Sequence, residues 1–411
     1  MEEQRTVYDL GIDLNDEFAM VSYFQSNMEE PETVSMTAGS EIYQIPAVLA
    51  KRSNVSVWYY GDEAKRMAKT SEVVCVDALL SRAFHREVID IGGEHYEAVE
   101  LLALFLRKMI ELPQKLGGIG VMNRLILTVE RVNAETMKLF WKIASLLGIP
   151  TDKFLVIDHK ESFYCYALSQ QPELWLHDIF LFEATSDAVG YYELKRDRRT
   201  TPQVVSIRES KRYMLAGEQR DELFLAILQK AFEGKIISSV YLVGDGFDGD
   251  WMKQSLSYVC RGRRAFAGKN LFSKGACYAG AVRNASNWPC IYMGENEMKF
   301  NLSIKVRDKG AMAFYHLITA GHNWFEAKGE CEVIFSGKGS VDFWKQLPNS
   351  REAKIETLQL TDLPARPDRT TRLRILAKPV SDEKVEITIR DLGFGEFFRS
   401  SDKTWKYTMS L

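Results

Sequence analysis

A chain of 411 residues is too long for one ordinary hydrophobic core, so two or more domains are expected. Its content of 46% hydrophobic and 27% charged residues is typical of a globular protein and excludes disordered and fibrous classes. The formal net charge of -3 excludes the broad basic field that sequence-independent binding to nucleic acid needs, so nucleic acid is not an expected partner.

The N-terminus carries no targeting or anchoring pattern. Residues 1–11 read MEEQRTVYDLG and contain no apolar stretch, and the most apolar segment, 101–112, is short and includes three charged residues. The six cysteines form no CxxC pair, and the six histidines have no HExxH spacing. We therefore expect a cytoplasmic protein with reduced thiols, no membrane span and no metal site.

The first 285 residues alternate strand patterns with helix patterns. Runs at 7–14 and 18–24 flank the tight turn Leu14-Asn15-Asp16-Glu17, which predicts a hairpin with an acid at its bend. Further strands are predicted at 124–129, 154–157, 178–182 and 240–243, and helices at 97–112, 134–147 (ending at Gly148), 161–170 and 223–232. Helices packed on mixed sheets, the α/β class, are therefore expected.

The pattern changes after residue 285. From residue 298 onward, alternating runs such as 300–306, 372–377 and 384–389 are separated by turn residues, with no long helical stretch. Asn, Gly and Pro interrupt the periodic segments between 284 and 296, where the boundary is expected. We predict a first domain at 1–285 and a mostly β domain at 296–411.

The order of motifs resembles the actin-like ATPase superfamily and, most closely, the DnaK-type heat-shock chaperones. YDLGIDLND is similar to the family's first phosphate loop, and DIFLFEATSDAVGYYEL to its second. GDEAK resembles the segment that follows the family's early strands, and VIDHKESFYCYALSQ resembles its connecting segment. SVYLVGDGFDG is similar to the adenosine motif, and LFSKGACYAGA to the helix that closes it. The stretch LQLTDLPARPDRTTRLRILAKPVSDEKVEITIRDLGFGEF resembles the end of the chaperones' substrate domain. The resemblance implies an actin-like (ribonuclease H-like) two-lobed domain with a shortened second lobe, followed by a β sandwich without a helical lid.

The resemblance places six residues at nucleotide-binding positions: Asp13, Asn15, Asp158, Glu183, Gly244 and Gly246. Phosphates need close approach of bare backbone, yet Asn15 stands where a glycine is expected and residues 184–187 stand where a run of glycines is expected. Asp16 and Glu17 would also set two carboxylates beside a polyanion. We therefore expect no cofactor and no catalytic residue, with ATP and Mg as the alternative.

Simpler structural roles compete for these positions. For Asp13 we favour a turn acid that hydrogen-bonds backbone amides beside its hairpin over a role in binding a metal and its water. For Gly244-Asp245-Gly246 we favour an ordinary turn after a strand.

The β domain holds the candidates for binding a peptide. In chaperones of this type, loops between strands hold an extended peptide. Residues 309–314 fall at the first such loop and 337–341 at the second, which makes Met312, Phe314, Ser340 and Val341 candidates. The alternative, which we favour, is that Met312 and Phe314 fill the sandwich core.

Three functions follow from these expectations. The first is a chaperone-like pseudo-ATPase that binds a protein or peptide segment. The second is an active ATPase or kinase of the same superfamily, with a site built from Asp13, Asp158 and Glu183. The third is an actin-like scaffold protein that assembles through its first domain.

Overall fold

The computed structural model describes residues 6–37, 39–52, 57–70, 73–115, 120–285, 287–337 and 339–410. The first five residues of the charged N-terminal segment lie outside these ranges. The chain forms two compact units, Met1–Lys195 with Ile207–Ser286 and Arg196–Ser206 with Asn287–Leu411. The short segment 196–206, which the sequence places in the first domain, thus belongs to the second unit. No helix in the described ranges is long and apolar enough to cross a membrane.

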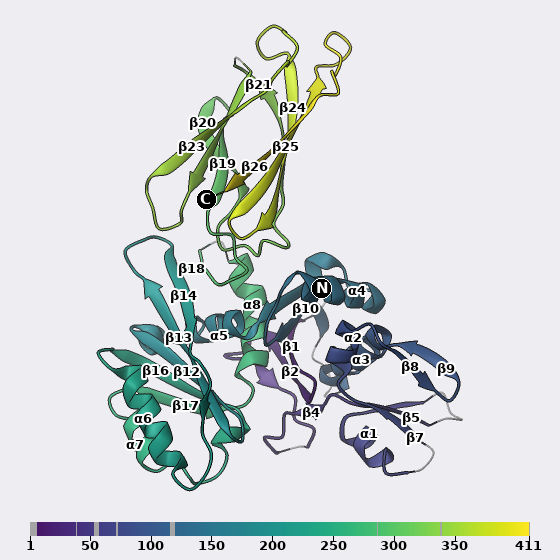
Figure 1. Ribbon diagram of the computed structural model, residues 1–411, viewed down its shortest axis with the longest axis vertical. Coiled ribbons are helices and arrows are strands. Elements are labelled where there is room, and N and C mark those ends of the chain that lie inside the picture. Colours follow the sequence, from purple (N-terminus) through teal and green to yellow (C-terminus); the bar gives the residue numbers. More distant parts are fainter. Residues whose placement is uncertain are drawn as a thin grey trace, which may run out of the picture. The chain divides into compact units, whose positions relative to one another are not determined.

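The first sheet has the order β11-β10-β1-β2-β3 (Figure 1). Strand β1 pairs in parallel with β10, which pairs in parallel with β11, whereas β2 is antiparallel to β1. The strands are β1 (Val7–Leu14), β2 (Phe18–Gln25), β3 (Glu32–Thr33), β10 (Val121–Val129) and β11 (Phe154–Asp158), and β4 (Ile45–Pro46) pairs with β2. Most residues of β1 are buried, as expected for a strand whose two faces are both covered.

A second sheet in the chain repeats this order as β17-β16-β12-β13-β14, with β18 next to β14 and β15 next to β13. Strand β12 is parallel to β16 and antiparallel to β13, as β1 is to β10 and β2. Its strands are β12 (Asp178–Ala184), β13 (Ala188–Asp197), β14 (Gln203–Glu209), β15 (Tyr213–Met214), β16 (Ile237–Val243), β17 (Arg264–Gly268) and β18 (Cys290–Tyr292). The two sheets therefore share one topology.

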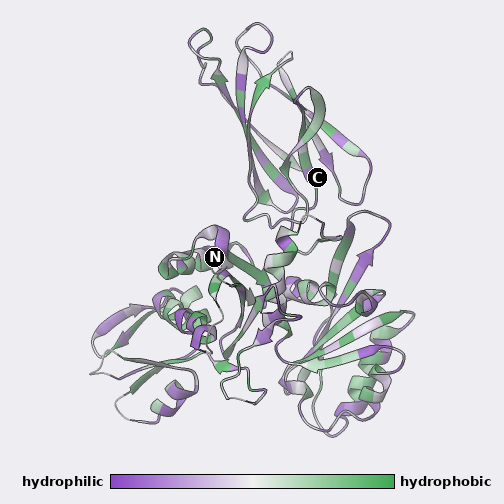
Figure 2. Cartoon of the chain, turned by 180° about the vertical axis from the view of Figure 1, so that it is seen from behind, coloured by the Kyte–Doolittle hydropathy of each residue, from purple (hydrophilic) through white to green (hydrophobic). Residues whose placement is uncertain are grey.

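Helices cover both sheets. They are α3 (Ala98–Lys115), α4 (Ala134–Leu147), α5 (His159–Leu168), α6 (Arg220–Phe232), α7 (Gln254–Val259) and α8 (Leu271–Asn284). The α4 helix begins where Asn133 accepts hydrogen bonds from two backbone amides and ends at Gly148, as predicted. Helices α6 and α7 pack against the second sheet, and its apolar residues join theirs in one core (Figures 1 and 2).

The remaining elements of the first unit are short. They are β5 (Leu49–Arg52), β6 (Trp58–Tyr60), α1 (Gly61–Met67), β7 (Val73–Val76), α2 (Leu79–Phe84), β8 (Val88–Ile91) and β9 (Glu94–Glu97), with 3-10 turns at Thr151–Lys153, Pro172–Trp175 and Asp245–Phe247. The GDEAK segment forms α1.

The second unit is built from two four-stranded antiparallel sheets, with the orders β20-β19-β22-β23 and β21-β24-β25-β26. The strands are β19 (Asn301–Asp308), β20 (Ala311–Ile318), β21 (Gly329–Phe335), β22 (Ser340–Gln346), β23 (Ala353–Gln359), β24 (Thr371–Ser381), β25 (Lys384–Gly393) and β26 (Thr404–Ser410). One apolar core takes side chains from both sheets, including Ile304, Phe343 and Ile387. No helix occurs in its described residues after Phe314.

Candidate functional site

The turn between β1 and β2 is closed by its own side chains. The Oδ1 atom of Asn15 accepts hydrogen bonds from the backbone amides of Glu17 (2.9 Å) and Phe18 (2.8 Å). Asp16 accepts from the backbone amide of Ser81 (2.9 Å) and from its hydroxyl group, at the start of α2. The groups expected to face phosphates are thus engaged in holding the turn and a neighbouring helix.

Asp13 pairs with a histidine. Its Oδ1 atom lies 2.8 Å from Nε2 of His159, the first residue of α5, and both side chains are buried. The imidazole also stacks on the ring of Phe272, with ring centroids 3.9 Å apart. The predicted role of Asp13 as an acceptor for turn amides is therefore wrong, because the partner is a side chain from another element.

Three carboxylates act on His159. Burial alone lowers the pKa of this imidazole, but the charge and hydrogen bond of Asp13, with the charges of Glu183 and Asp158, outweigh burial and raise the pKa. Asp13, Asp158 and Glu183, the three carboxylates of the alternative active site, thus all raise the pKa of a histidine that sequence reasoning missed. No spacing rule singles out His159, which simply follows Asp158 in the chain.

Asp158 begins α5. Its Oδ1 atom accepts a hydrogen bond from the backbone amide of Glu161 at 2.8 Å, the usual role of an aspartate at a helix start. Burial raises the pKa of its carboxyl group to about 6. Glu161 in turn receives two hydrogen bonds from the guanidinium group of Arg283, at 2.9 and 3.0 Å, which ties α5 to α8.

The turn between β12 and β13 is closed by a backbone hydrogen bond and by a contact between its own side chains. Glu183 accepts a hydrogen bond from Arg212 at 3.0 Å. The backbone amide of Thr185 donates to the carbonyl of Ala188 at 2.8 Å, and the Thr185 hydroxyl donates to Asp187 at 3.1 Å.

Gly244 and Gly246 allow two turns of the chain to approach closely. A Cβ atom on Gly244, where φ is +104°, would lie 2.3 Å from the carbonyl oxygen of Ala184, and one on Gly246 would lie 2.1 Å from that of Thr185. Arg220 donates a hydrogen bond to the carbonyl of Gly246 at 2.6 Å. The expected simple turn forms here as a 3-10 turn, and its glycines contact the β12–β13 turn of the same chain.

These residues do not fit Mg-ATP. The described residues contain no group of three or more His, Cys, Asp or Glu side chains arranged to hold a metal ion. Asp13 and Glu183 are each paired with a basic residue, and the turns that would expose bare backbone to phosphates are closed by Asn15 and by Thr185. This arrangement supports no chemical step on a nucleotide.

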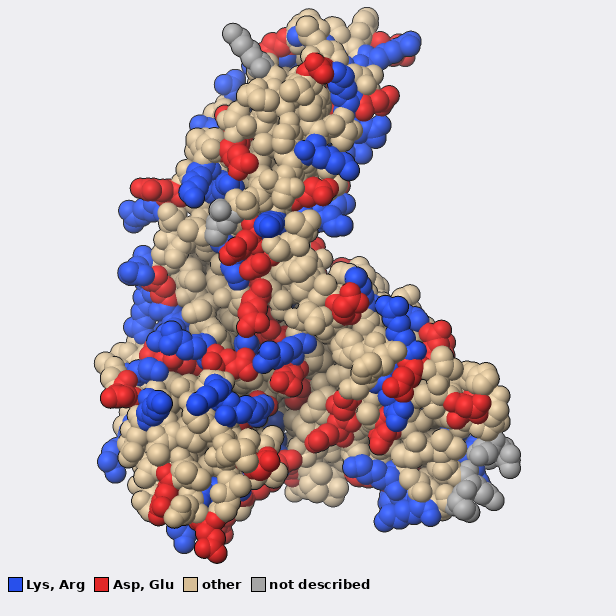
Figure 3. All heavy atoms as spheres, in the orientation of Figure 1, with Lys and Arg blue, Asp and Glu red and all other residues tan. Residues whose placement is uncertain are grey.

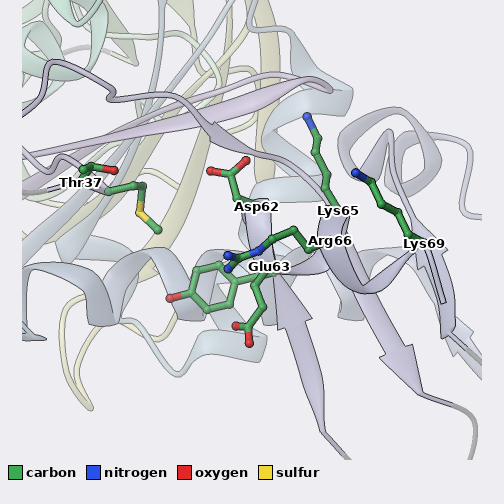
Figure 4. Close-up of a pocket in the computed structure, with 8 residues that line it drawn as sticks. Thr37, Asp62, Glu63, Lys65, Arg66 and Lys69 are labelled. Atoms are coloured by element: carbon green, nitrogen blue, oxygen red, sulfur yellow. The ribbon is translucent and has the colours of Figure 1, made fainter.

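A separate hollow of about 550 Å³ lies beside α1 (Figure 4). It is lined by Met36, Thr37, Tyr60, Asp62, Glu63, Lys65, Arg66 and Lys69. In Figure 4 the side chains of Lys65, on α1, and of Lys69, in the turn that follows α1, extend in the same direction. All five charged lining residues are exposed and their signs are mixed, which is the character of a solvated helix face. None of them belongs to the group around His159.

The four peptide candidates of the second unit lie on strands instead of loops. Met312 and Phe314 belong to β20, and their side chains are 54% and 50% exposed, so the prediction that they fill the core is wrong. Ser340 and Val341 begin β22, and Val341 packs partly against the core. Of the segment 337–341, Lys338 lies outside the described residues.

Two comparisons place the chain among known sequences. The family described as "Family of unknown function (DUF5716) C-terminal" matches residues 30–295, and the one described as "Domain of unknown function (DUF8552)" matches residues 297–411. No curated protein matches the chain.

Proposed function

The chain belongs to the family of unknown function (DUF5716) C-terminal, and we propose that it is a chaperone-like pseudo-ATPase that acts as a protein- or peptide-binding module. The proposal has two parts, an actin-like first unit that binds no nucleotide and a β-sandwich second unit that binds an extended segment. A cytoplasmic location belongs to the same proposal, and the free state of all six cysteines supports it.

The repeated topology supports the actin-like part of the proposal. Both sheets place the first strand of their hairpin in the centre, its antiparallel partner on one side and two parallel strands on the other. Helices α5 and α8 pack together, and a Cβ atom on Gly275 of α8 would lie 2.1 Å from the carbonyl oxygen of Ser162 of α5. Two sheets of one topology with a helix following each are what an actin-like fold requires.

The Asp13–His159 pair supports the loss of ATPase activity. A carboxylate that binds a cation in a nucleotide site must be open to that cation, whereas Asp13 is 2% exposed and hydrogen-bonded to an imidazole whose pKa is raised. Freeing it would leave the buried Nε2 of His159 without its hydrogen-bond partner, which costs about 1 to 3 kcal/mol. This pairing disfavours the alternative of an active ATPase or kinase.

Calorimetry with the full chain tests the loss of nucleotide binding. We expect no binding of Mg-ATP or Mg-ADP tighter than about 10 µM, or about -7 kcal/mol. A protein with known ATP affinity, titrated from the same stock, is the control. Tighter binding would show that the closed turns open for the nucleotide, and the active-enzyme alternative would then be preferred.

The observation that carries the binding role is the position of β20. It has a strand partner on one side only, β19, within the described sheet, and Met312 and Phe314 are exposed on it. Phe314 contacts the ring of Trp344 edge-on, with ring centroids 5.2 Å apart, so it lies over the outer face of the sheet. An edge strand with exposed apolar side chains can accept an added strand, which gains backbone hydrogen bonds worth about 0.5 to 1.5 kcal/mol each.

Basic residues beside this edge suggest the chemistry of the bound segment. The pairing of β19 with β20 places Lys305 opposite Phe314 and Arg307 opposite Met312, and both basic side chains are exposed. On the face of the molecule shown in Figure 3, basic and acidic side chains are interspersed. The preferred partner is therefore an extended segment in which apolar and acidic residues alternate.

A double variant tests this role. We expect Met312→Ala with Phe314→Ala to weaken binding of arrayed apolar–acidic peptides at least tenfold, because both apolar anchors are lost. The matched control is Ile334→Ala with Val380→Ala, which removes two exposed apolar side chains (58% and 47%) from the other sheet of the same unit. Equal weakening by both pairs would remove β20 from consideration. Absence of binding by the unaltered chain would favour the scaffold alternative.

A further inference from the structure

Four aromatic rings of the first unit form a continuous row. Phe266 of β17 stacks on Tyr241 of β16, with centroids 5.2 Å apart and planes 17° apart. Tyr241 meets Tyr166 of α5 edge-on at 5.7 Å, and Tyr166 meets Tyr278 of α8 at 6.2 Å. The row therefore runs from the second sheet to the two packed helices, whose labels are shown in Figure 1.

This row forms one wall of a cavity of about 480 Å³. The rest of the lining comes from seven polar residues, Glu29, Glu30, Ser169, Gln170, Gln171, Asn270 and Lys274, and from Leu242, Val243, Ala267, Gly268 and Leu271. A wall of aromatic rings with a few polar groups around it is the usual composition of a small-molecule site. None of the residues around His159 lines it.

The polar rim is negative. It holds two carboxylates, Glu29 and Glu30, and one ammonium group, that of Lys274, which lies 3.1 Å from Glu30. Glu29 is exposed and has no ion pair within the described part of the chain. Burial raises the pKa of Tyr166 to about 12, and the charge of Glu30 adds to this rise. The field at the hydroxyl end of the ring row is therefore negative.

We propose that this cavity binds an organic cation, an alkylated ammonium or guanidinium group. Such a cation is attracted to ring faces by their quadrupole and to the rim by its carboxylates, while its alkyl groups replace water against the rings. The carboxylates disfavour an anion at the same place. The same group can belong to a free small molecule or to a basic side chain of a protein, and this site is distinct from β20 in the proposed function.

Choline and its neutral analogue 3,3-dimethyl-1-butanol separate charge from shape. We expect choline to bind the full chain saturably in calorimetry and the neutral analogue to bind at least tenfold more weakly, a difference of about 1.4 kcal/mol. Equal affinity for the two would show an apolar pocket without cation recognition and would overturn the proposal. Absence of saturable choline binding would overturn it as well.

Two variants assign the binding to this cavity. Phe266 is 41% exposed, so Phe266→Leu removes a ring face with little effect on folding, and Glu29→Gln removes a carboxylate that has no partner among the described residues. We expect each to weaken choline binding about tenfold. The matched controls are Phe84→Leu, at a ring that is 40% exposed, and Glu63→Gln, at the hollow beside α1. Choline affinity that is unchanged in Phe266→Leu, or equally reduced in Phe84→Leu, would place the binding elsewhere.

A second series of titrations identifies whether the cation belongs to a small molecule or to a protein side chain. A short peptide with one trimethylated lysine, a peptide with one arginine, and choline are titrated against the same chain. Tighter binding of a peptide that is also lost in Phe266→Leu assigns the site to a protein side chain, and tighter binding of choline assigns it to a small molecule. These outcomes do not depend on β20, so the Met312→Ala, Phe314→Ala variant should bind choline as the unaltered chain does.

Discussion

At Asp13 a buried carboxylate is neutralised by an imidazole from another element. The pair spans 146 positions of the chain, from the end of β1 to the start of α5. Burial lowers the pKa of His159, and the raised pKa means that Asp13, together with the charges of Glu183 and Asp158, outweighs burial. The pair thus fixes the first hairpin to α5 through a buried hydrogen bond between side chains of two elements.

Replacing Asp13 with asparagine should destabilise the first unit by about 3 to 5 kcal/mol near pH 6, because one partner of a buried ion pair is left alone. The pKa of His159 is raised on folding, so His159 stabilises the folded state. Its contribution to the free energy of unfolding is fully present below about pH 6.5 and is lost as pH rises through the folded-state pKa. The unaltered chain should therefore lose stability above that pH, and Asp13→Asn should show a flatter profile.

Thermal unfolding, followed by circular dichroism between pH 6 and 9, measures how the stability of the unaltered chain and of Asp13→Asn depends on pH. Asp16→Asn is the control, because Asp16 bonds Ser81 and has no contact with His159. Parallel pH profiles for the unaltered chain and Asp13→Asn would show that the pair does not carry the dependence.

Among the elements, the close approach of the β12–β13 turn to residues 244–246 gives a direct prediction. Gly246→Ala would place a methyl group 2.1 Å from the carbonyl oxygen of Thr185 and 2.6 Å from Cβ of Ala184, so one turn must move. We expect a loss of about 1 to 3 kcal/mol in urea unfolding. At Gly190 of β13 the nearest atom would be 3.7 Å away, and Gly190→Ala should be nearly neutral. Equal effects would mean that the two turns separate easily.

The sequence predicts elements better than it predicts which of their residues meet. The helix at 134–147 and its end at Gly148 follow from local periodicity and a glycine stop, and the structure confirms both. His159 was missed because its partner Asp13 lies on β1, 146 positions away, and no local pattern reports such a contact. Sequence reasoning favours a core position for Phe314 because large apolar side chains are usually buried, and no local pattern shows that this residue lies on an edge strand.

At the scale of the whole molecule, the buried ion pairs of the two units respond to pH in opposite directions. In the first, the raised pKa values of His159 and of Asp158, the latter about 6, both remove stability as pH rises. In the second, Asp391 is fully buried and accepts two hydrogen bonds of 2.8 Å from Arg366. Burial alone raises the pKa of Asp391, but these bonds, with those from Ser401 and Gly393, outweigh it and lower the pKa.

Because the pKa of Asp391 is lowered on folding, this residue stabilises the folded state. Its contribution to the free energy of unfolding is fully present above the unfolded-state pKa of about 4 and is lost as pH falls through the folded-state pKa. Calorimetry of the full chain should therefore show two transitions, one lowered at pH 9 and the other at pH 3, relative to pH 6. Asp391→Asn should lower only the acid-sensitive transition, by about 3 to 5 kcal/mol, and Asp13→Asn only the alkali-sensitive one. The two units have separate hydrophobic cores and their own buried ion pairs, so we expect them to unfold independently. A single transition that both variants lower equally would mean instead that the units unfold together.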